Sequence, residues 1–122
     1  MNLDNLTLGV DIESISRFNE LDRKKNKSFL DKIYSEKELD YCYSHKNYAQ
    51  HLAVRFAAKE AIFKAFSSCG LDSPFYNKIE ILNKKNGSPY LKIKDMKKIK
   101  AKLSLSHCNK KALAFVVMEI PS

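Results

Sequence analysis

Apolar and polar residues alternate regularly in the first recognisable element of the chain, residues 7–13. Leu8, Val10 and Ile12 fall on one side of this pattern, and Asp11 lies on the other. Such alternation is typical of a β-strand with one buried face. We therefore expect the three apolar side chains to face the core.

Helical periodicity follows in three places. Apolar residues recur at helical spacing over 14–32, although the basic run 23–27 interrupts the pattern and predicts a turn there. Ser35-Glu36-Lys37-Glu38 fits a capping box, so a helix should begin at this point. Residues 50–66 predict the strongest helix, because this alanine-rich segment lacks glycine and proline and is apolar on most of its circumference.

The second half of the chain is predicted to be rich in strands. The segments concerned are 78–83, 90–94, 103–107 and 112–120, with a short helix at 95–102. Asn86-Gly87 predicts a hairpin turn between the first two of these strands. This mixture favours an α+β fold, in which an antiparallel sheet packs against helices.

Length and composition limit the class of protein. With 122 residues, of which 44% are hydrophobic and 30% charged, the chain is expected to form a single domain over residues 1–122. Its longest apolar run, Ala112–Met118, is too short to cross a bilayer. Three widely spaced cysteines without a Cys-x-x-Cys pair favour neither a disulfide framework nor a zinc site, and the simplest location is the cytoplasm.

A net charge of +8 adds information about partners. Such a surface attracts nucleic acid, anionic membrane, phosphorylated small molecules or an acidic protein. Only three of the 22 basic residues are arginines, which weighs against direct reading of DNA bases. Charge alone does not choose among the remaining partners.

Asp11 has two interpretations. Aspartate is depleted in strands, because its short polar side chain competes with the backbone ladder and resists burial. One interpretation is an exposed carboxylate on the solvated face of a sheet, and the other is a metal ligand. The strand by itself favours the exposed carboxylate.

Charged residues inside the apolar helix raise a similar choice, since they need partners or water. Glu60 and Lys64 are four residues apart and are suited to a structural ion pair. The functional interpretation is that Glu60 and Asp11 bind Mg²⁺, which prefers oxygen ligands and usually also binds substrate phosphates. Arg55, Lys59 and Lys64 would then supply cations for the phosphates.

Histidines and nucleophiles give a weaker signal. His107 ends a predicted strand, and a lone histidine is usually structural or exposed. His45 and His51 lack metal-ligand spacing. No nucleophile elbow, Walker loop or dinucleotide motif is present in the sequence.

Several short segments of the sequence together match one pattern. The most specific one is Arg55-Phe56-Ala57-Ala58-Lys59-Glu60-Ala61, with Gly9-Val10-Asp11-Ile12 upstream and Ser104-Leu105-Ser106-His107 downstream. Further matching segments are 29–39, 64–66, 79–81 and Asn86-Gly87-Ser88-Pro89, together with Arg17. Over about residues 8–119 the chain resembles the holo-acyl-carrier-protein synthase family, the small 4′-phosphopantetheinyl transferases.

The resemblance implies a reaction. The family transfers the 4′-phosphopantetheine arm of coenzyme A to a serine of apo-acyl carrier protein and releases adenosine 3′,5′-bisphosphate. Transfer of this type depends mostly on positioning and charge neutralisation. The family resemblance also implies a homotrimer with each site between two protomers, and neither nucleic acid nor membrane as a partner.

Site residues are carried over from the same resemblance. Asp11 and Glu60 match the Mg²⁺ ligands, and Glu60 is also the candidate base for the serine. The positions that match coenzyme A contacts are Arg55, Lys64, Asn86, Gly87, Pro89 and His107. The acidic carrier protein is expected to dock on Arg17, Arg23 and Lys24.

The sequence departs from the family at two turns. Ser67-Ser68-Cys69-Gly70 stands where a Gly-Thr-Gly-Ile turn is usual, and Ser88 replaces a frequent lysine. The first change favours one alternative, an inactive relative that binds coenzyme A or carrier protein without transfer. A second alternative, a nucleic-acid-binding module, explains the lysine clusters but neither Asp11 nor a glutamate inside the apolar helix.

Overall fold

The computed structural model of the chain describes residues 2–120, which contain two antiparallel sheets. The larger sheet has the strand order β1 (Leu6–Ser14), β5 (Lys111–Glu119) and β4 (Lys100–His107). The smaller sheet pairs β2 (Ile79–Asn83) with β3 (Pro89–Ile93). With the helices described next, these sheets confirm the predicted α+β class.

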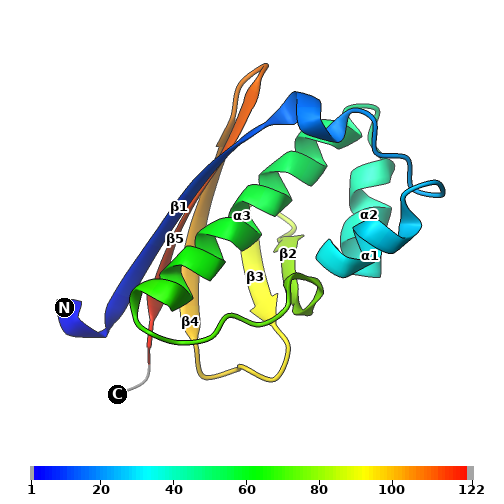
Figure 1. Cartoon of the computed structure of the whole chain (residues 1–122). Coiled ribbons are helices and arrows are strands. Elements are labelled where there is room, and N and C mark those ends of the chain that lie inside the picture. The colour runs from blue at the N-terminus through cyan, green and yellow to red at the C-terminus, as the bar shows by residue number, and fades with distance from the viewer. Residues whose placement is uncertain (1, 121–122) are drawn as a thin grey trace.

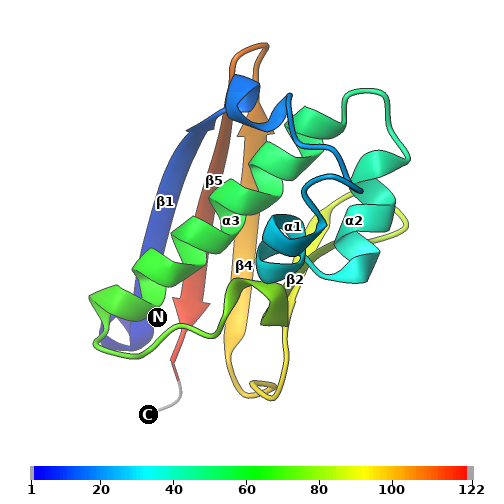
Figure 2. The ribbon, with the colours of Figure 1, turned by 45° about the vertical axis from the view of Figure 1, so that its right-hand side comes forward.

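The helices are arranged around the longest one, α3 (Tyr48–Ser68), which runs along one face of the larger sheet (Figure 1). α1 (Lys27–Ile33) and α2 (Glu36–Tyr43) lie beyond α3, on the side away from that sheet (Figure 2). Short 3₁₀ turns are η1 (Leu3–Asn5), η2 (Ile15–Phe18) and η3 (Tyr76–Lys78). No helix within residues 2–120 is long and apolar enough to cross a membrane.

Small side chains let α3 approach β1 closely. Ala57, Ala61 and Ala65 are fully buried in the core between the helix and the larger sheet. The Thr7 hydroxyl donates a hydrogen bond of 2.6 Å to the Ala65 carbonyl, which ties strand to helix. A Cβ atom added to Gly9 would stand 1.7 Å from the Ala61 carbonyl oxygen, so this contact requires glycine. The start of β1 is thereby fixed directly beneath the C-terminal half of α3.

The predicted orientation of β1 is wrong. Leu8, Val10 and Ile12 are 54%, 50% and 57% exposed, whereas the alternate residues, including Gly9 and Glu13, face α3. Alternation identifies the two faces of a strand but not which of them meets the core. In this chain the face that carries Gly9 meets the core, because only that face lets the backbone of α3 approach.

Other predicted elements are partly confirmed. The capping box at the start of α2 is present, with the Ser35 hydroxyl accepting from the Glu38 amide and the Glu38 carboxylate accepting from the Ser35 amide. The helix predicted over 14–32 is instead the turn η2 followed by α1. The helix predicted over 95–102 is wrong, since this segment forms turns before β4 begins at Lys100.

Candidate active site

Carboxylates from β1 and α3 converge where the strand passes under the helix. The Asp11 side chain is only 11% exposed, and its Oδ1 accepts a hydrogen bond of 3.0 Å from Lys64 Nζ. Its other oxygen, Oδ2, is buried and has no hydrogen-bond partner among the described residues. A buried carboxylate oxygen without a donor is costly, so Asp11 is not the exposed carboxylate that the strand pattern alone favoured.

Glu13 lies beside Asp11 on the same face of β1 and was not predicted as a site residue. Burial raises the pKa of Glu13 to about 7, and repulsion from the neighbouring charge of Asp11 adds to the shift. The Glu60 charge raises this pKa further, whereas Arg17, 2.5 Å from the Glu13 carboxylate, lowers it. Three carboxylates therefore share one region, and the i,i+2 spacing of Asp11 and Glu13 was the available signal in the sequence.

Tyr76 covers Glu60 from the other side. Its ring packs edge-on against Phe56 and Phe63, at centroid distances of 6.1 Å and 6.5 Å. Burial raises the pKa of Tyr76 most, and the negative charge of Glu60 acts in the same direction. Sequence reasoning also missed this residue, which comes from η3 rather than from a recognised motif.

Asp11, Glu13 and Glu60 form what we call the acidic cluster. Lys64 contacts this cluster through Asp11 and not through the predicted pair with Glu60. Its ammonium donates to Asp11 and to the Val10 carbonyl, both at 3.0 Å, and the structural pair with Glu60 is not formed. The side chain remains about half exposed, at 51%. Lys64 can therefore neutralise Asp11 in the free protein and still face solvent.

A metal ion would have to be bound with few protein ligands. Within residues 2–120, no group of three or more His, Cys, Asp or Glu side chains is arranged to hold one. The unpartnered Asp11 Oδ2 nevertheless offers the kind of oxygen ligand that a hard cation binds. Mg²⁺ commonly takes one or two carboxylates and completes its shell with waters and phosphate oxygens.

The second group of predicted residues lies around Arg55. Arg55 is 3% exposed, and its Nη2 donates 2.7 Å to the Asn83 side chain, which in turn donates 3.1 Å to the Gly87 carbonyl. The guanidinium also stands 4.4 Å from the centre of the Tyr41 ring. Arg55 is thus connected to the turn that precedes β3.

That turn is well defined. Gly87 has a φ of 87°, in the left-handed region that favours glycine. The Asn86 side chain accepts hydrogen bonds from the Ser88 amide and hydroxyl, at 3.0 Å and 2.6 Å, and Pro89 begins β3. The predicted Asn86, Gly87 and Pro89 are therefore held together by local contacts.

His107 ends β4 and lies beside the first turn of α3, which carries Gln50. Its Nε2 is 3.1 Å from Gln50 Nε2. Burial lowers the pKa of the nearby His51 to about 4, and the charges of His45, Arg55 and His107 contribute. Arg55 and Lys64, in contrast, are separated by two and a half turns of α3 and so point to opposite sides of the helix.

The predicted docking residues lie along the segment from η2 to α1. Arg17 is bonded to Glu13, and Arg23 pairs with Asp40 at 2.6 Å and with Glu36 at 3.4 Å. Lys24 is exposed, and its backbone amide donates to Asp22. Two of the three cations are therefore already paired in the isolated chain.

The departure at Ser67-Ser68-Cys69-Gly70 has a local explanation. α3 continues to Ser68, and the chain then leaves the helix through Gly70, whose φ is 76°. The Leu71 amide donates 3.0 Å to the Phe66 carbonyl, which closes the helix end. One left-handed glycine is therefore sufficient for this turn.

Comparison with known proteins agrees with this arrangement. The chain is 41% identical over 112 residues to a holo-[acyl-carrier-protein] synthase of Thermodesulfovibrio yellowstonii, covering 91% of this chain and 96% of the relative. Its counterpart from Chloroherpeton thalassium is 37% identical over 118 residues, covering 93% and 98%.

Solved structures give the same result. A holo-(acyl-carrier-protein) synthase from Bacillus anthracis in complex with CoA (3′,5′-ADP) superposes with a TM-score of 0.75 at 30% identity, covering 94% of this chain and 96% of that one. The Helicobacter pylori enzyme in complex with coenzyme A gives 0.76 at 26% identity, covering 92% and 99%. Residues 7–116 match the profile of one family, and the chain therefore belongs to the 4′-phosphopantetheinyl transferase superfamily.

Proposed function

We propose that this chain transfers the 4′-phosphopantetheine arm of coenzyme A to a serine of apo-acyl carrier protein, as a single domain over residues 1–122. The observation that carries the proposal is the convergence of Asp11, Glu13 and Glu60 beneath α3, in a chain whose relatives are named holo-acyl-carrier-protein synthases. This convergence provides the negative charge needed to hold a cation against a pyrophosphate. The cytoplasmic location expected from the sequence is consistent with this reaction.

Mg²⁺ is the proposed cofactor, with Asp11 and Glu60 as its ligands. The unpartnered Asp11 Oδ2 supports this assignment, and Lys64 is placed to move from Asp11 to a phosphate oxygen. When bound, the ion would neutralise charge that develops on the phosphates. Glu60 is proposed to accept the proton of the carrier-protein serine.

Coenzyme A is proposed to contact both groups of residues. Lys64 would bind near the pyrophosphate, while Arg55, His107 and the turn Asn86–Pro89 would bind the remaining phosphate and the adenosine. Since Arg55 and Lys64 point to opposite sides of α3, one copy of the chain is poorly arranged to use both on one ligand. A site completed by a second copy resolves this difficulty.

The open face of the larger sheet supports such an assembly. Leu8, Val10 and Ile12 pair with Val117, Phe115 and Leu113 of β5, and the paired apolar side chains lie on the face opposite α3. A contiguous apolar surface of this kind usually marks an interaction site. We propose that three copies associate through this face, which gives a homotrimer with sites between protomers.

Replacing Phe115 with lysine is expected to reduce the particle to a single chain. Phe115 is 39% exposed in the isolated chain and lies opposite Val10, so a lysine should leave each chain folded but place charges in the interface. Sedimentation velocity would measure the mass, with Phe75→Lys as a control at a more exposed aromatic position. A wild-type chain that sediments as a monomer would overturn the trimer.

Docking of the acidic carrier protein is proposed on Arg17, Arg23 and Lys24. The net charge of +8 favours such a partner electrostatically. Because Arg17 and Arg23 are paired with acidic side chains of their own chain, the carrier protein would have to compete for them or share them. The proposed reaction requires neither nucleic acid nor membrane as a partner.

The test is the intact mass of apo-acyl carrier protein after incubation with the chain, coenzyme A and Mg²⁺. We expect a gain of one phosphopantetheine arm and its loss when EDTA is added. Coenzyme A binding without any mass gain, over several carrier proteins, would instead identify an inactive relative. Binding to any duplex without Mg²⁺ or coenzyme A would support the nucleic-acid-binding module.

A further inference from the structure

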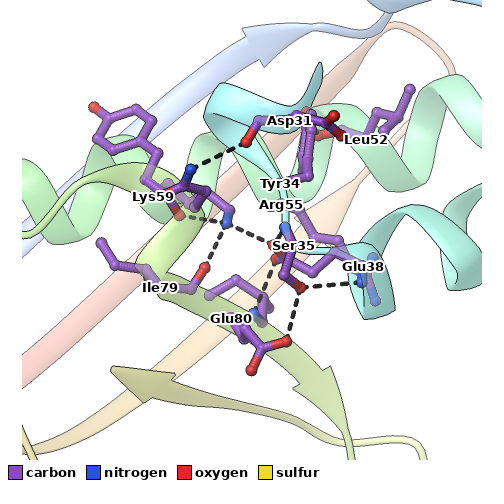
Figure 3. Close-up of polar contacts among 12 residues, drawn as sticks. Asp31, Tyr34, Ser35, Glu38, Leu52, Arg55, Lys59, Ile79 and Glu80 are labelled. Atoms are coloured by element: carbon purple, nitrogen blue, oxygen red, sulfur yellow. Dashed lines mark hydrogen bonds and ion pairs between the residues drawn. The ribbon is translucent and has the colours of Figure 1, made fainter. Parts of the chain in front are cut away.

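Lys59 precedes Glu60 on α3 but points away from the acidic cluster, into the protein interior. Its side chain is completely buried, and Nζ donates to Glu38 at 2.7 Å, to the Tyr76 carbonyl at 2.8 Å and to the Ile79 carbonyl (Figure 3). An ammonium has three donors, and all three are used. This lysine is therefore fully committed within the fold and is not available to a ligand.

Glu38 is equally committed. Its Oε1 accepts from Lys59 and from the Ser35 amide, and its Oε2 accepts from the Ile81 amide at 3.0 Å. The pair joins the start of α2, the middle of α3 and strand β2 (Figure 3). A completely buried ion pair adds little net stability relative to apolar residues of the same volume. The contribution of the pair next to Glu60 therefore lies in the geometry that it fixes.

Tyr76 is the residue whose position the pair determines. Its carbonyl is held by Lys59, and its ring packs against Phe56 and Phe63, which lie one turn before and one turn after Glu60 on α3. Both the backbone and the ring of Tyr76 are thus tied to the helix that carries Glu60. The ring of Tyr76 consequently lies over the turn of α3 that carries Glu60.

We propose that Tyr76 and Lys59 are positioning residues for Glu60: Lys59, held by Glu38, fixes Tyr76, and the Tyr76 hydroxyl holds the Glu60 carboxylate in the orientation used with Asp11. The inference rests on the proposed function, because it assigns these residues to that reaction. Neither residue contacts substrate in this assignment. A group that orients a metal-binding carboxylate typically changes affinity or activity by 10- to 100-fold when it is removed.

Tyr76→Phe is the decisive variant, because it keeps the ring packing and removes only the hydroxyl. We expect kcat to fall about tenfold with KM for coenzyme A unchanged. Mn²⁺ binding, measured by electron paramagnetic resonance without substrates, should weaken by a similar factor. The matched control is Tyr43→Phe, which likewise removes one tyrosine hydroxyl. In this case the hydroxyl donates to the Leu21 carbonyl, and its loss should change neither kcat nor Mn²⁺ affinity.

A second variant tests the buried pair. The double substitution Glu38→Gln with Lys59→Met removes both charges together, so that no single charge is left buried. Its effect on kcat should not add to that of Tyr76→Phe, since both act through one carboxylate. Thermal unfolding would identify the temperature range in which each variant is folded.

Failure of the inference and failure of the proposed function are distinguishable. If the wild-type chain transfers phosphopantetheine and Tyr76→Phe keeps its kcat and Mn²⁺ affinity, the positioning role is overturned and the function stands. If the wild-type chain does not transfer, the function fails, and the Mn²⁺ comparison between wild type and Tyr76→Phe still decides the positioning role. Additive effects of the two sets of substitutions would overturn the part assigned to Lys59.

Discussion

Asp11→Asn is expected to lower the rate of phosphopantetheine transfer roughly 1,000-fold, the size seen when a key electrostatic group is removed from an active site. The substitution keeps the size of the side chain but removes the negative charge that Lys64 neutralises in the free protein. It also replaces one carboxylate oxygen with an amide nitrogen, a poor ligand for Mg²⁺. Intact mass of the carrier protein over time gives the rate.

Folding should survive this change. Asp11 Oδ2 has no hydrogen-bond partner within residues 2–120, so the amide breaks no contact of that atom. Thermal unfolding of the variant checks this expectation, and Asp4→Asn, at an exposed aspartate in η1, is the matched control. A transfer rate within tenfold of wild type at saturating Mg²⁺ would contradict the role proposed for Asp11.

Gly9→Ala is expected to destabilise the chain by at least about 3 kcal/mol, at the upper end of the cost of overpacking. The added Cβ would stand 1.7 Å from the Ala61 oxygen and 2.7 Å from its carbonyl carbon. Both are backbone atoms of α3, so no side-chain rotation can relieve the overlap. The helix would have to move away from β1, which would also separate Glu60 from Asp11.

Urea unfolding measures this cost, and Gly70→Ala is its matched control. Gly70 has a φ of 76°, but a Cβ added there would meet no described atom within 4 Å, so the control carries only the backbone penalty, about 1–2 kcal/mol. The difference between the two variants is therefore the cost of the contact with α3. Equal unfolding midpoints of the two variants would mean that the contact with α3 adds no cost, which would contradict the prediction.

Much of the fold was predictable because local signals determined it. The capping box at Ser35, the alanine-rich α3 and the Asn86-Gly87 turn each have a local physical cause, and each is present in the structure. The resemblance supplied Asp11 and Glu60. The turns at 95–99 were mistaken for a helix because Met96 and Ile99 recur at helical spacing, a weak signal in so short a segment.

The errors arose where tertiary contacts decide. Placing the apolar side of β1 against the core ignored that Gly9 allows α3 onto the polar side, and the same error concealed Glu13 as a neighbour of Asp11. The partner of Lys59 is Glu38, in a different helix, and no local spacing connects them. Tyr76 reaches Glu60 only because the chain returns from the end of α3 through η3.

The two faces of β1 have a consequence for how this gene segment can change. One face carries Asp11 and Glu13, and the other carries Leu8, Val10 and Ile12. Deleting or inserting a single codon within the strand would exchange the faces, because side chains alternate with a period of two. Such a frame-preserving change would put the carboxylates toward the open side and bulky side chains beneath the helix at once. The number of residues in this strand is therefore as constrained as the identity of Gly9 or Asp11.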